Sequence, residues 1–379
     1  MKKTIAAAIC ALLLLQAGCF GCQSPRGAPG PISPAVSPTG AVSGGAQQFQ
    51  AQFLGLFDTV TTLIGYSDSQ DDFTALAGRV KEKLREYNDL YDIYNTYDGI
   101  NNLKTVNDNA GIAPVRVDPR IIRLLQFARA EYDRTGGRMN VALGAVTSIW
   151  LRYRTAGIND PASAQLPPMS DLQAAARHTD INDVIIDERA STVYLSDPEM
   201  SLDVGAVAKG YATEMTAQYF ADQGVQSMLL SVGGNVRAIG EKTNGGGQST
   251  PWIVGIQNPD LGSAENELLT VNVDGGSVVT SGTYERYYTV NGVRYHHIID
   301  PSTLMPAAYF TSVTIFCQDS GLADALSTGV FNMPYEEGRA LIESLGLGAL
   351  WIMKDGTVRA TAGVKNLVHS SNVDIEYDE

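Results

Sequence analysis

The sequence predicts an α+β fold in which mixed, largely antiparallel sheets are flanked by helices. Strand-like segments follow one another as hairpins and do not alternate strictly with helices. The clearest hairpin turn is Asn291-Gly292, inside the strand-rich segment 277–300. The sequence contains no G-x-G-x-x-G segment between a strand and a helix, and no P-loop. We therefore expect neither a Rossmann domain nor a P-loop nucleotide site.

The first residues have the layout of an export signal. Residues 1–18, "MKKTIAAAICALLLLQAG", begin with two lysines and continue as an apolar run that ends in small residues. Cys19 follows directly, as in the processing site of bacterial lipoproteins. We expect Cys19 to become lipidated and to hold the protein at the membrane, because more than one acyl chain anchors stably. The alternative is ordinary signal cleavage with Cys19 unmodified.

A linker and a globular body follow. Residues 19–48 are rich in proline, glycine and serine, which predicts a tether, and residues 49–379 form the body. The formal net charge of −14 becomes −16 without the two signal lysines. That balance argues against nucleic acid and anionic lipid as partners of the globular part. After signal removal, Cys22 and Cys317 remain beside Cys19, so no disulfide framework is predicted.

The first half of the body contains one predicted strand followed by helices. β-Branched residues alternate along 57–66, which is typical of a strand. Apolar residues recur at steps of three and four along 73–94, which predicts a long amphipathic helix. Asp118 and Pro119 have the favoured order for a helix start, and the sequence Thr-Gly-Gly at 135–137 predicts its end.

The remainder of the body is richer in strands. Ser170 is expected to cap a short helix, and 183–195 to form a hairpin. Two helices are predicted at 321–332 and 335–346, before a last pair of strands. The other strand-like segments are 226–240, 251–259, 268–273, 277–300 and 311–317.

A carboxylate and an ammonium lie close together in "SLDVGAVAKGYATEM", residues 201–215. We expect a strand that ends at Asp203, a tight turn, and a helix from about Ala206 to Gln223 that Gly224 stops. Lys209 then lies in the first turn of that helix, where the helix terminus already favours anions. The segment predicts a phosphate-binding corner; the alternative is a structural Asp–Lys pair.

Two further pairs of residues could carry chemistry. Asp324 and Thr328 are four apart, hence on one face of a helix, and could supply oxygen ligands to Mg²⁺. The alternative for them is a solvated face or cap. His296 and His297 are adjacent in a strand and point to opposite faces. His297, or Asp300 nearby, could be a general base, whereas His296 is expected to be a half-exposed strand residue.

Six motifs in order resemble the FAD:protein FMN transferases of the ApbE family, over about 57–331. They are "DVGAVAKGYA", "SVGGNVRAIG", "WIVGIQNP", "TSGTYERYY", "HHIIDPSTLMP" and "ADALSTGVF". The resemblance implies an exported α+β protein, often a lipoprotein. It also implies an enzyme that cleaves FAD, joins FMN to a threonine or serine hydroxyl of a target protein and releases AMP.

The resemblance also implies roles for individual residues. Asp203 and Lys209 correspond to flavin and phosphate contacts. The backbone carbonyl of Ala206 and the side chains of Asp324 and Thr328 correspond to Mg²⁺ ligands. The remaining counterparts are Tyr97 as an aromatic that packs on the flavin, Phe57 as an early apolar contact, Arg138, Met139 and Asn140 as a cofactor-binding triplet, Ile298 as an apolar contact, and His297 as the base.

The chain departs from the family pattern at two places. Met139-Asn140 stands where many members have Phe-Asp, which exchanges a charged acceptor for a neutral amide. Thr303-Leu304-Met305-Pro306 lacks the usual glycine, for which we expect a modest loop difference. Tyr97 could equally be a core residue beneath the long helix, and for Phe57 the core position is the favoured interpretation.

Three functions remain open from the sequence. The first is Mg²⁺-dependent transfer of FMN from FAD to an exported flavoprotein of membrane electron-transport complexes, on the extracytoplasmic face of the cell membrane. The second is an FAD pyrophosphatase that yields FMN and AMP. The third is a lipid-tethered FAD-binding protein without turnover.

Overall fold

A ten-stranded sheet forms the centre of the computed structural model, which describes residues 35–38, 46–243 and 248–378. All neighbouring strands are antiparallel except β18 and β20. In spatial order the strands are β1 (Ala35–Pro38), β2 (Gln47–Leu56), β3 (Thr59–Ser67), β7 (Met228–Val232), β8 (Asn235–Ile239), β13 (Gly276–Gly282), β16 (Phe310–Cys317), β17 (Gly348–Met353), β18 (Val358–Ala360) and β20 (Ile375–Tyr377).

Four smaller sheets and eight α-helices complete the described part of the chain. The sheets are β4 (Val115–Arg116) with β6 (Thr192–Leu195) and β5 (Val184–Asp187); β9 (Lys242–Thr243) with β10 (Ser249–Thr250); β11 (Trp252–Gln257) with β12 (Glu267–Val273) and β19 (Val368–Ser371); and β14 (Tyr287–Val290) with β15 (Val293–His296). The helices are α1 (Gln70–Tyr91), α2 (Leu103–Asp108), α3 (Pro119–Arg134), α4 (Gly144–Asn159), α5 (Met169–Ala175), α6 (Ala208–Asp222), α7 (Ser320–Phe331) and α8 (Tyr335–Ser344).

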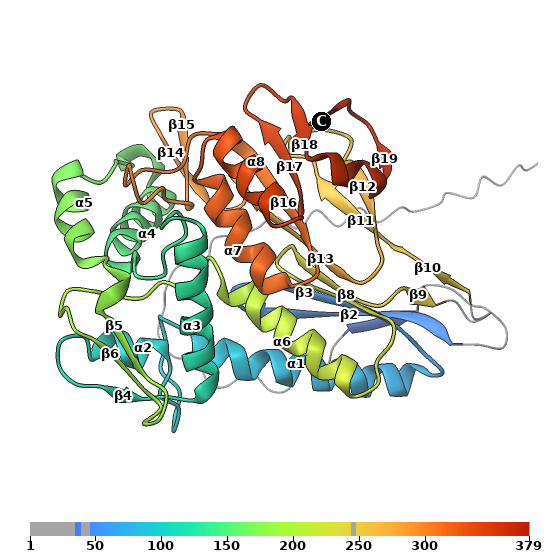
Figure 1. Cartoon of the computed structure of the whole chain (residues 1–379), viewed down its shortest axis with the longest axis horizontal. Coiled ribbons are helices and arrows are strands. Elements are labelled where there is room, and N and C mark those ends of the chain that lie inside the picture. The colour runs from blue at the N-terminus through green and yellow to red at the C-terminus, as the bar shows by residue number, and fades with distance from the viewer. Residues whose placement is uncertain (1–34, 39–45, 244–247, 379) are drawn as a thin grey trace, which may run out of the picture. The chain divides into compact units, whose positions relative to one another are not determined.

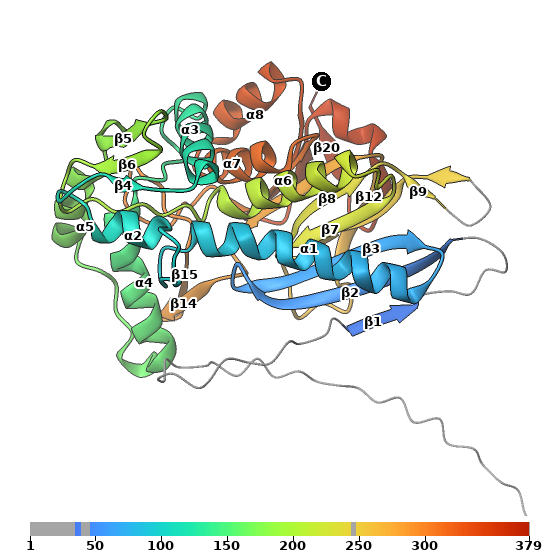
Figure 2. The same ribbon diagram turned by 90° about the horizontal axis from the view of Figure 1, so that it is seen from below.

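Helices and a second sheet cover the central sheet. Helix α6 packs between α1 and α7 (Figures 1 and 2). Helix α1 contacts β2 and β3, α6 contacts β7 and β8, and α7 contacts β13 and β16. The sheet β11-β12-β19 shares a buried cluster with β13, β16, β17 and β18. A further group of helices, α2 to α5, lies beside one end of the central sheet (Figure 1). At this end α6 begins and α7 ends. The antiparallel sheets and flanking helices confirm the predicted fold class.

The hairpin β2–β3 corrects the prediction of a first strand at 57–66. Phe57 and Asp58 form the turn, with φ of 51° and 53°, and the strand begins only at Thr59. The preceding strand β2 was not predicted, although Phe49, Ala51 and Phe53 alternate as buried residues along it. Two-residue turns with positive φ match the twist of the strands, so the turn sets this register.

Part of the segment predicted as a tether forms a strand. Residues Ala35–Pro38 pair antiparallel with β2 at the edge of the central sheet. An edge strand needs hydrogen bonds on one side only and therefore accepts proline. The signal at 1–18, Cys19 and Cys22 lie outside the described residues. Within the described ranges, no helix has the length and apolar character needed to cross a membrane.

Several predicted helix boundaries are confirmed and two are wrong. Asp118 caps α3 through its side chain and the backbone nitrogen of Arg120, and Gly136 and Gly137, both at positive φ, follow the helix end. Ser170 does not cap α5, because that helix begins at Met169 after Pro168 and Ser170 lies within it. The long helix ends at Tyr91, so Tyr94 lies beyond it and is exposed.

The predicted hairpins are confirmed. Segment 183–195 contains the antiparallel pair β5–β6. Asn291 and Gly292, at φ of 49° and 81°, join β14 to β15 as the dipeptide predicts. The strand expected before Asp203 is absent, since residues 201–204 form no strand and the backbone nitrogen of Asp203 instead donates to the carbonyl of Val141.

Candidate active site

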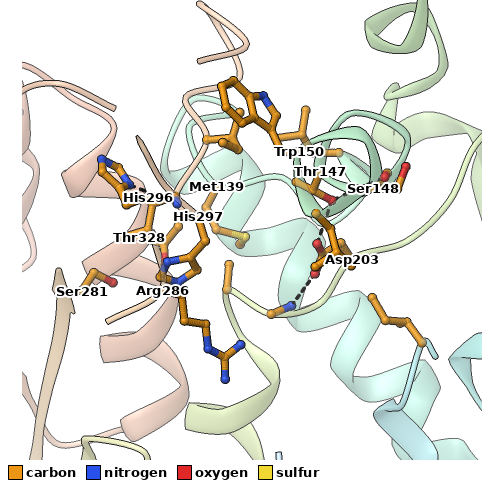
Figure 3. Close-up of a pocket in the computed structure, with 18 of the residues that line it drawn as sticks. Met139, Thr147, Ser148, Trp150, Asp203, Ser281, Arg286, His296, His297 and Thr328 are labelled. Atoms are coloured by element: carbon orange, nitrogen blue, oxygen red, sulfur yellow. Dashed lines mark hydrogen bonds between the residues drawn. The ribbon is translucent and has the colours of Figure 1, made fainter. Parts of the chain in front are cut away.

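A cavity of about 750 Å³ brings together most of the residues that the sequence analysis selected. Its walls come from α4, the segment before α6, the start of β8, the end of β13, the loop after β15, and α7 (Figure 3). The lining includes Arg138, Met139, Asn140, Asp203, Ala206, Lys209, His297, Ile298, Asp324 and Thr328. Segments far apart in the chain therefore meet in one cavity.

Asp203 is held by two hydrogen bonds at the wall formed by α4. Its Oδ2 accepts from the hydroxyl of Thr147 at 2.7 Å, and its Oδ1 accepts from the backbone nitrogen of Gly205 at 3.0 Å. Figure 3 shows Thr147 and Asp203 facing each other, joined by the first of these bonds. The carboxylate orientation is therefore fixed before any ligand binds.

Asp324 lies where α6 meets α7. Its Oδ2 accepts from the backbone nitrogen of Gly210 at 2.8 Å, and its Oδ1 lies 3.9 Å from Nζ of Lys209. The side chain is buried, and burial raises the pKa of this carboxyl. A carboxylate here is only partly compensated within the protein, because a buried charge needs close partners to be stable.

Ala206 and Thr328 complete an oxygen-rich corner. Both line the same cavity as Asp324, and Thr328 lies one helical turn after it on α7. Helix α6 begins at Ala208, so Ala206 belongs to the turn before the helix and not to the helix predicted from Ala206 onward. A carboxylate, a hydroxyl and a backbone carbonyl are the kinds of oxygen that Mg²⁺ takes. The donor set therefore fits the ion that the resemblance implies.

His297 directly follows β15 and so lies outside the strand in which it was expected, with its ring against the cavity (Figure 3). Its Nδ1 is buried and has no hydrogen-bond partner among the described residues. Burial lowers the pKa of His297 to about 3, and nearby positive charges contribute in the same direction. In decreasing order these charges are Arg286, Arg154 and Lys209. The ring is therefore neutral near pH 7.

The prediction for His296 is wrong. The residue is buried, its Nε2 contacts the carbonyl of Ala307 at 2.9 Å, and its Nδ1 accepts from the nitrogen of Ile298 at 3.2 Å. The ring also packs edge-on against Phe331. The chain after the strand folds back over His296, so the strand face that was expected to be half-exposed is covered.

Asp300, the alternative base, is buried away from the cavity lining. Its Oδ1 accepts from the nitrogen and the hydroxyl of Ser302, at 2.8 and 2.7 Å, and lies 3.5 Å from Arg138. Leu304, which replaces the usual glycine of this loop, has φ of 60° and so keeps a left-handed conformation. Its carbonyl accepts from Nε1 of Trp150 at 2.9 Å.

The structure explains the amide at position 140. Nδ2 of Asn140 donates to the carbonyl of Thr179 at 3.0 Å, and its Oδ1 accepts from the nitrogen of Ala142 at 2.8 Å. A carboxylate could make only the second of these bonds. Met139 is buried beside it, and Arg138 donates to the hydroxyl of Ser302 at 3.1 Å. All three residues of the triplet line the cavity, and Asn140 also binds the scaffold.

Phe57 and Tyr97 are not among the residues that line the cavity. Phe57 occupies the β2–β3 turn, where its nitrogen donates to Oδ1 of Asn88 at 2.8 Å and its ring packs against two core clusters. The hydroxyl of Tyr97 donates to Oδ2 of Asp92 at 2.8 Å. The exposed Tyr94 lines the cavity in their place.

Sequence reasoning missed several lining residues. Thr147, Trp150 and Arg154 lie on α4, a helix for which no motif was found. Arg286 lies within the quoted motif "TSGTYERYY" but was given no role. Of these residues, only Arg286 had a sequence feature that could have identified it, because it is a cation within a motif of small and aromatic residues.

Comparisons with known proteins identify the family of this chain. The model of the ApbE family matches residues 57–351. The FAD:protein FMN transferase of Treponema pallidum (strain Nichols) is 38% identical over 278 residues, which cover 70% of this chain and 74% of that protein. The enzyme of the same name from Klebsiella pneumoniae (strain 342) is 33% identical over 283 residues, covering 74% and 83%.

A solved structure gives the same result for the fold. The crystal structure of the ApbE protein from Thermotoga maritima superposes with a TM-score of 0.73 at 27% sequence identity, and the match covers 84% of this chain and 98% of that one. Together with the family match over most of the described body, these similarities show that the chain belongs to the ApbE family.

Proposed function

We propose that this protein transfers FMN from FAD to a threonine or serine hydroxyl of a target protein and releases AMP. The observation that carries the proposal is the meeting of Asp324 and Thr328, from α7, with Ala206 and Lys209, from the start of α6, in one cavity with His297. The relatives named FAD:protein FMN transferase support the same reaction.

The proposed reaction breaks the phosphoanhydride bond of the FAD diphosphate and forms a phosphate ester bond. The hydroxyl oxygen of the target forms a bond to the phosphorus of the FMN half, and the bond from that phosphorus to the bridging oxygen breaks. AMP leaves with the bridging oxygen and its electron pair. The hydroxyl proton goes to the neutral imidazole of His297. Phosphoryl transfer of this kind depends on positioning and on charge stabilisation.

The residues of the chain supply position and charge. Asp203, fixed by Thr147 and Gly205, is oriented to accept a hydrogen bond from FAD. Lys209 and the first turn of α6 favour the negative phosphates. His297 is neutral near pH 7 because its pKa is about 3, so it has a free site for a proton. The negative charge of the bound diphosphate offsets the surrounding cations and makes His297 a stronger base.

Mg²⁺ would be held by the carboxylate of Asp324, the hydroxyl of Thr328 and the carbonyl of Ala206. A bound Mg²⁺ supplies positive charge that stabilises the phosphate oxygens as AMP departs. Among the described residues there is no group of three or more His, Cys, Asp or Glu side chains placed to hold a metal. The proposed ligand set is accordingly one carboxylate with uncharged oxygens, and Mg²⁺ typically adds water and substrate phosphate to such a set.

The test is a labelling reaction with purified full-length protein. FAD, Mg²⁺ and an acceptor protein with a Ser/Thr-Gly-Ala-Thr segment are combined, and the acceptor is examined for a covalent fluorescent flavin. A labelled acceptor and one AMP per label are expected. Free FMN and AMP without a label would indicate an FAD pyrophosphatase. Bound FAD that stays intact through prolonged exposure to Mg²⁺ would indicate a binding protein without turnover.

We also propose an exported, lipid-anchored protein whose acceptor is a flavoprotein of membrane electron-transport complexes. The signal-like residues 1–18 and the position of Cys19 support export and lipidation. Metabolic labelling with a fatty acid tests the anchor, with Cys19→Ala as the control that must lose the label. A Cys19→Ala protein that still carries the fatty acid would overturn the assignment.

A further inference from the structure

Two arginines of the cavity have no carboxylate within 4 Å among the residues that the structure describes. Arg154, half-buried on α4, and Arg286, exposed in the loop between β13 and β14, both line the cavity and form no hydrogen bond or ion pair with another described residue. Each of the other lysines and arginines in the lining has a carboxylate within 4 Å. These pairs are Lys104–Asp108, Arg138–Asp300 and Lys209–Asp324.

The two unpaired guanidinium groups also influence each other. Burial, and then the positive charge of Arg286, lower the pKa of Arg154. The two arginines come from neighbouring elements, because α4 packs against β14, which directly follows the loop of Arg286. Both also help to depress the pKa of His297. Figure 3 shows Arg286 next to His297. The carboxylate of Asp203 offsets part of the charge on Arg154. Neither arginine has a carboxylate within 4 Å in the described part of the chain, so their mutual repulsion remains unfavourable and an anionic ligand reduces that cost.

The position identifies the anion. In the proposed reaction, which this inference rests on, His297 takes the proton of the hydroxyl that attacks the phosphorus of the FMN half. The anion beside His297 is then the phosphate of the FMN half. The diphosphate of FAD also approaches Lys209 at the start of α6. Guanidinium groups suit this role because their planar donors can bind two phosphate oxygens at once. We infer that Arg154 and Arg286 together bind the phosphate of the FMN half of FAD.

The competing occupant is an acidic side chain of the acceptor protein. That alternative places the arginines outside the nucleotide site. Comparing the binding of FMN with that of riboflavin distinguishes the phosphate from the acceptor as the occupant. FMN and riboflavin share the flavin ring and differ in the phosphate. An arginine pair that binds the phosphate affects FMN alone, whereas a pair that binds the acceptor affects neither flavin.

The experiment measures FMN and riboflavin binding to the full-length protein by flavin fluorescence. Arg154→Gln and Arg286→Gln are each expected to weaken FMN binding about tenfold, as for the loss of a charged hydrogen bond. Riboflavin binding is expected to stay unchanged, which also shows that the variants are folded. Matched controls are Arg152→Gln on α4 and Arg294→Gln on β15, exposed arginines that stack on Tyr153 and Tyr287 and do not line the cavity.

Four outcomes decide the inference. It is overturned if both variants bind FMN like the wild type, if FMN and riboflavin weaken equally, or if only the KM for the acceptor rises. Loss of FMN binding alone, with partial recovery in Arg154→Lys and Arg286→Lys, supports it. The labelling reaction of the wild type is scored separately. If that reaction fails while the arginines still discriminate FMN from riboflavin, the transfer proposal fails and the phosphate site stands.

Discussion

The carboxylate of Asp324 accepts a hydrogen bond from the backbone nitrogen of Gly210, with 2.8 Å between Oδ2 and nitrogen. This bond joins the middle of α7 to the first turn of α6 across 114 positions of sequence. It requires close packing, because a Cβ atom on Gly210 would lie 2.3 Å from the carbonyl oxygen of Ser320 and 2.4 Å from Cβ of Asp324. The missing side chain at position 210 therefore allows the two halves of the cavity to meet.

Gly210→Ala is expected to destabilise the protein by about 1–3 kcal/mol, the usual cost of overpacking a close contact. The methyl group must push α6 away from α7, because one of the atoms that it meets is backbone. Denaturant unfolding measures the change. The control is Gly78→Ala on α1, where a Cβ meets no atom within 4 Å. That change should be neutral or stabilising, since alanine favours helix. Equal stabilities of the two variants would contradict the packing argument.

Asp324→Asn is expected to abolish transfer. Without Mg²⁺, the free energy of unfolding of the variant should equal or exceed that of the wild type. Burial raises the pKa of this carboxyl, so its ionised form at pH 7 costs folding free energy. The amide oxygen of asparagine can still accept from Gly210, but asparagine has no charge for Mg²⁺. Acceptor labelling should fall more than about a hundredfold, because even residues behind metal ligands contribute 10–100-fold.

Asp319→Asn is the matched control for that change. Asp319 lies on the same helix, also has a pKa raised by burial, and caps α7 away from the cavity lining. Asparagine is a good capping residue, so labelling should be retained. Labelling is followed by flavin fluorescence during a titration with Mg²⁺. If Asp324→Asn labels the acceptor as well as the wild type does, Asp324 is not a metal ligand.

Thr147→Val is expected to weaken FAD binding about fivefold without a large change in stability. Valine keeps the shape of the side chain but loses the hydroxyl that donates to Asp203 at 2.7 Å. One hydrogen bond of this kind contributes about 1 kcal/mol. Titration with FAD measures the effect, and Thr147→Ser should restore most of the affinity. Thr155→Val, at an exposed position of the same helix outside the lining, should behave like the wild type. If Thr147→Ser does not restore the affinity for FAD, Thr147 acts through packing and not through the orientation of Asp203.

Local spacing predicted the parts of the site that lie on one helix. Asp324 and Thr328 share a helix face because they are four apart, and Lys209 falls in the first turn of α6. The hairpins were predicted for the same reason, since turn residues such as Asn291-Gly292 act locally. These features depend on neighbours in the sequence and need no knowledge of tertiary contacts.

The features that sequence could not predict depend on distant segments. His296 is buried because the chain as far as Ala307 returns over it. Thr147 and Arg154 reach the cavity because α4 packs beside the β14–β15 hairpin, which lies more than a hundred positions later. Phe57 differs: the alternation in β2 was readable, but that strand was not predicted, and the turn after it was read as the start of the first strand.

His297→Gln is expected to reduce the loss of stability that acid causes. The folded pKa of His297 is about 3, below the usual value of 6.5, so the unfolded chain binds this proton more readily. Above pH 6.5 the ring is neutral in both states and does not change the free energy of unfolding. As the pH falls from 6.5 towards 3, the free energy of unfolding decreases. The slope is about 1.4 kcal/mol per pH unit for a full site. His296, whose pKa is also lowered by burial, contributes a separate part.

Urea unfolding at pH 7 and pH 5 measures this effect. The wild type should lose about 1–2 kcal/mol more between these two values than His297→Gln does, because glutamine cannot take up the proton. His369→Gln, a change at an exposed ring far along the sequence, should follow the wild type. Identical acid profiles for the wild type and His297→Gln would show that the ring can be protonated at little cost. The buried, unpartnered Nδ1 and the cations that face this ring argue against that result.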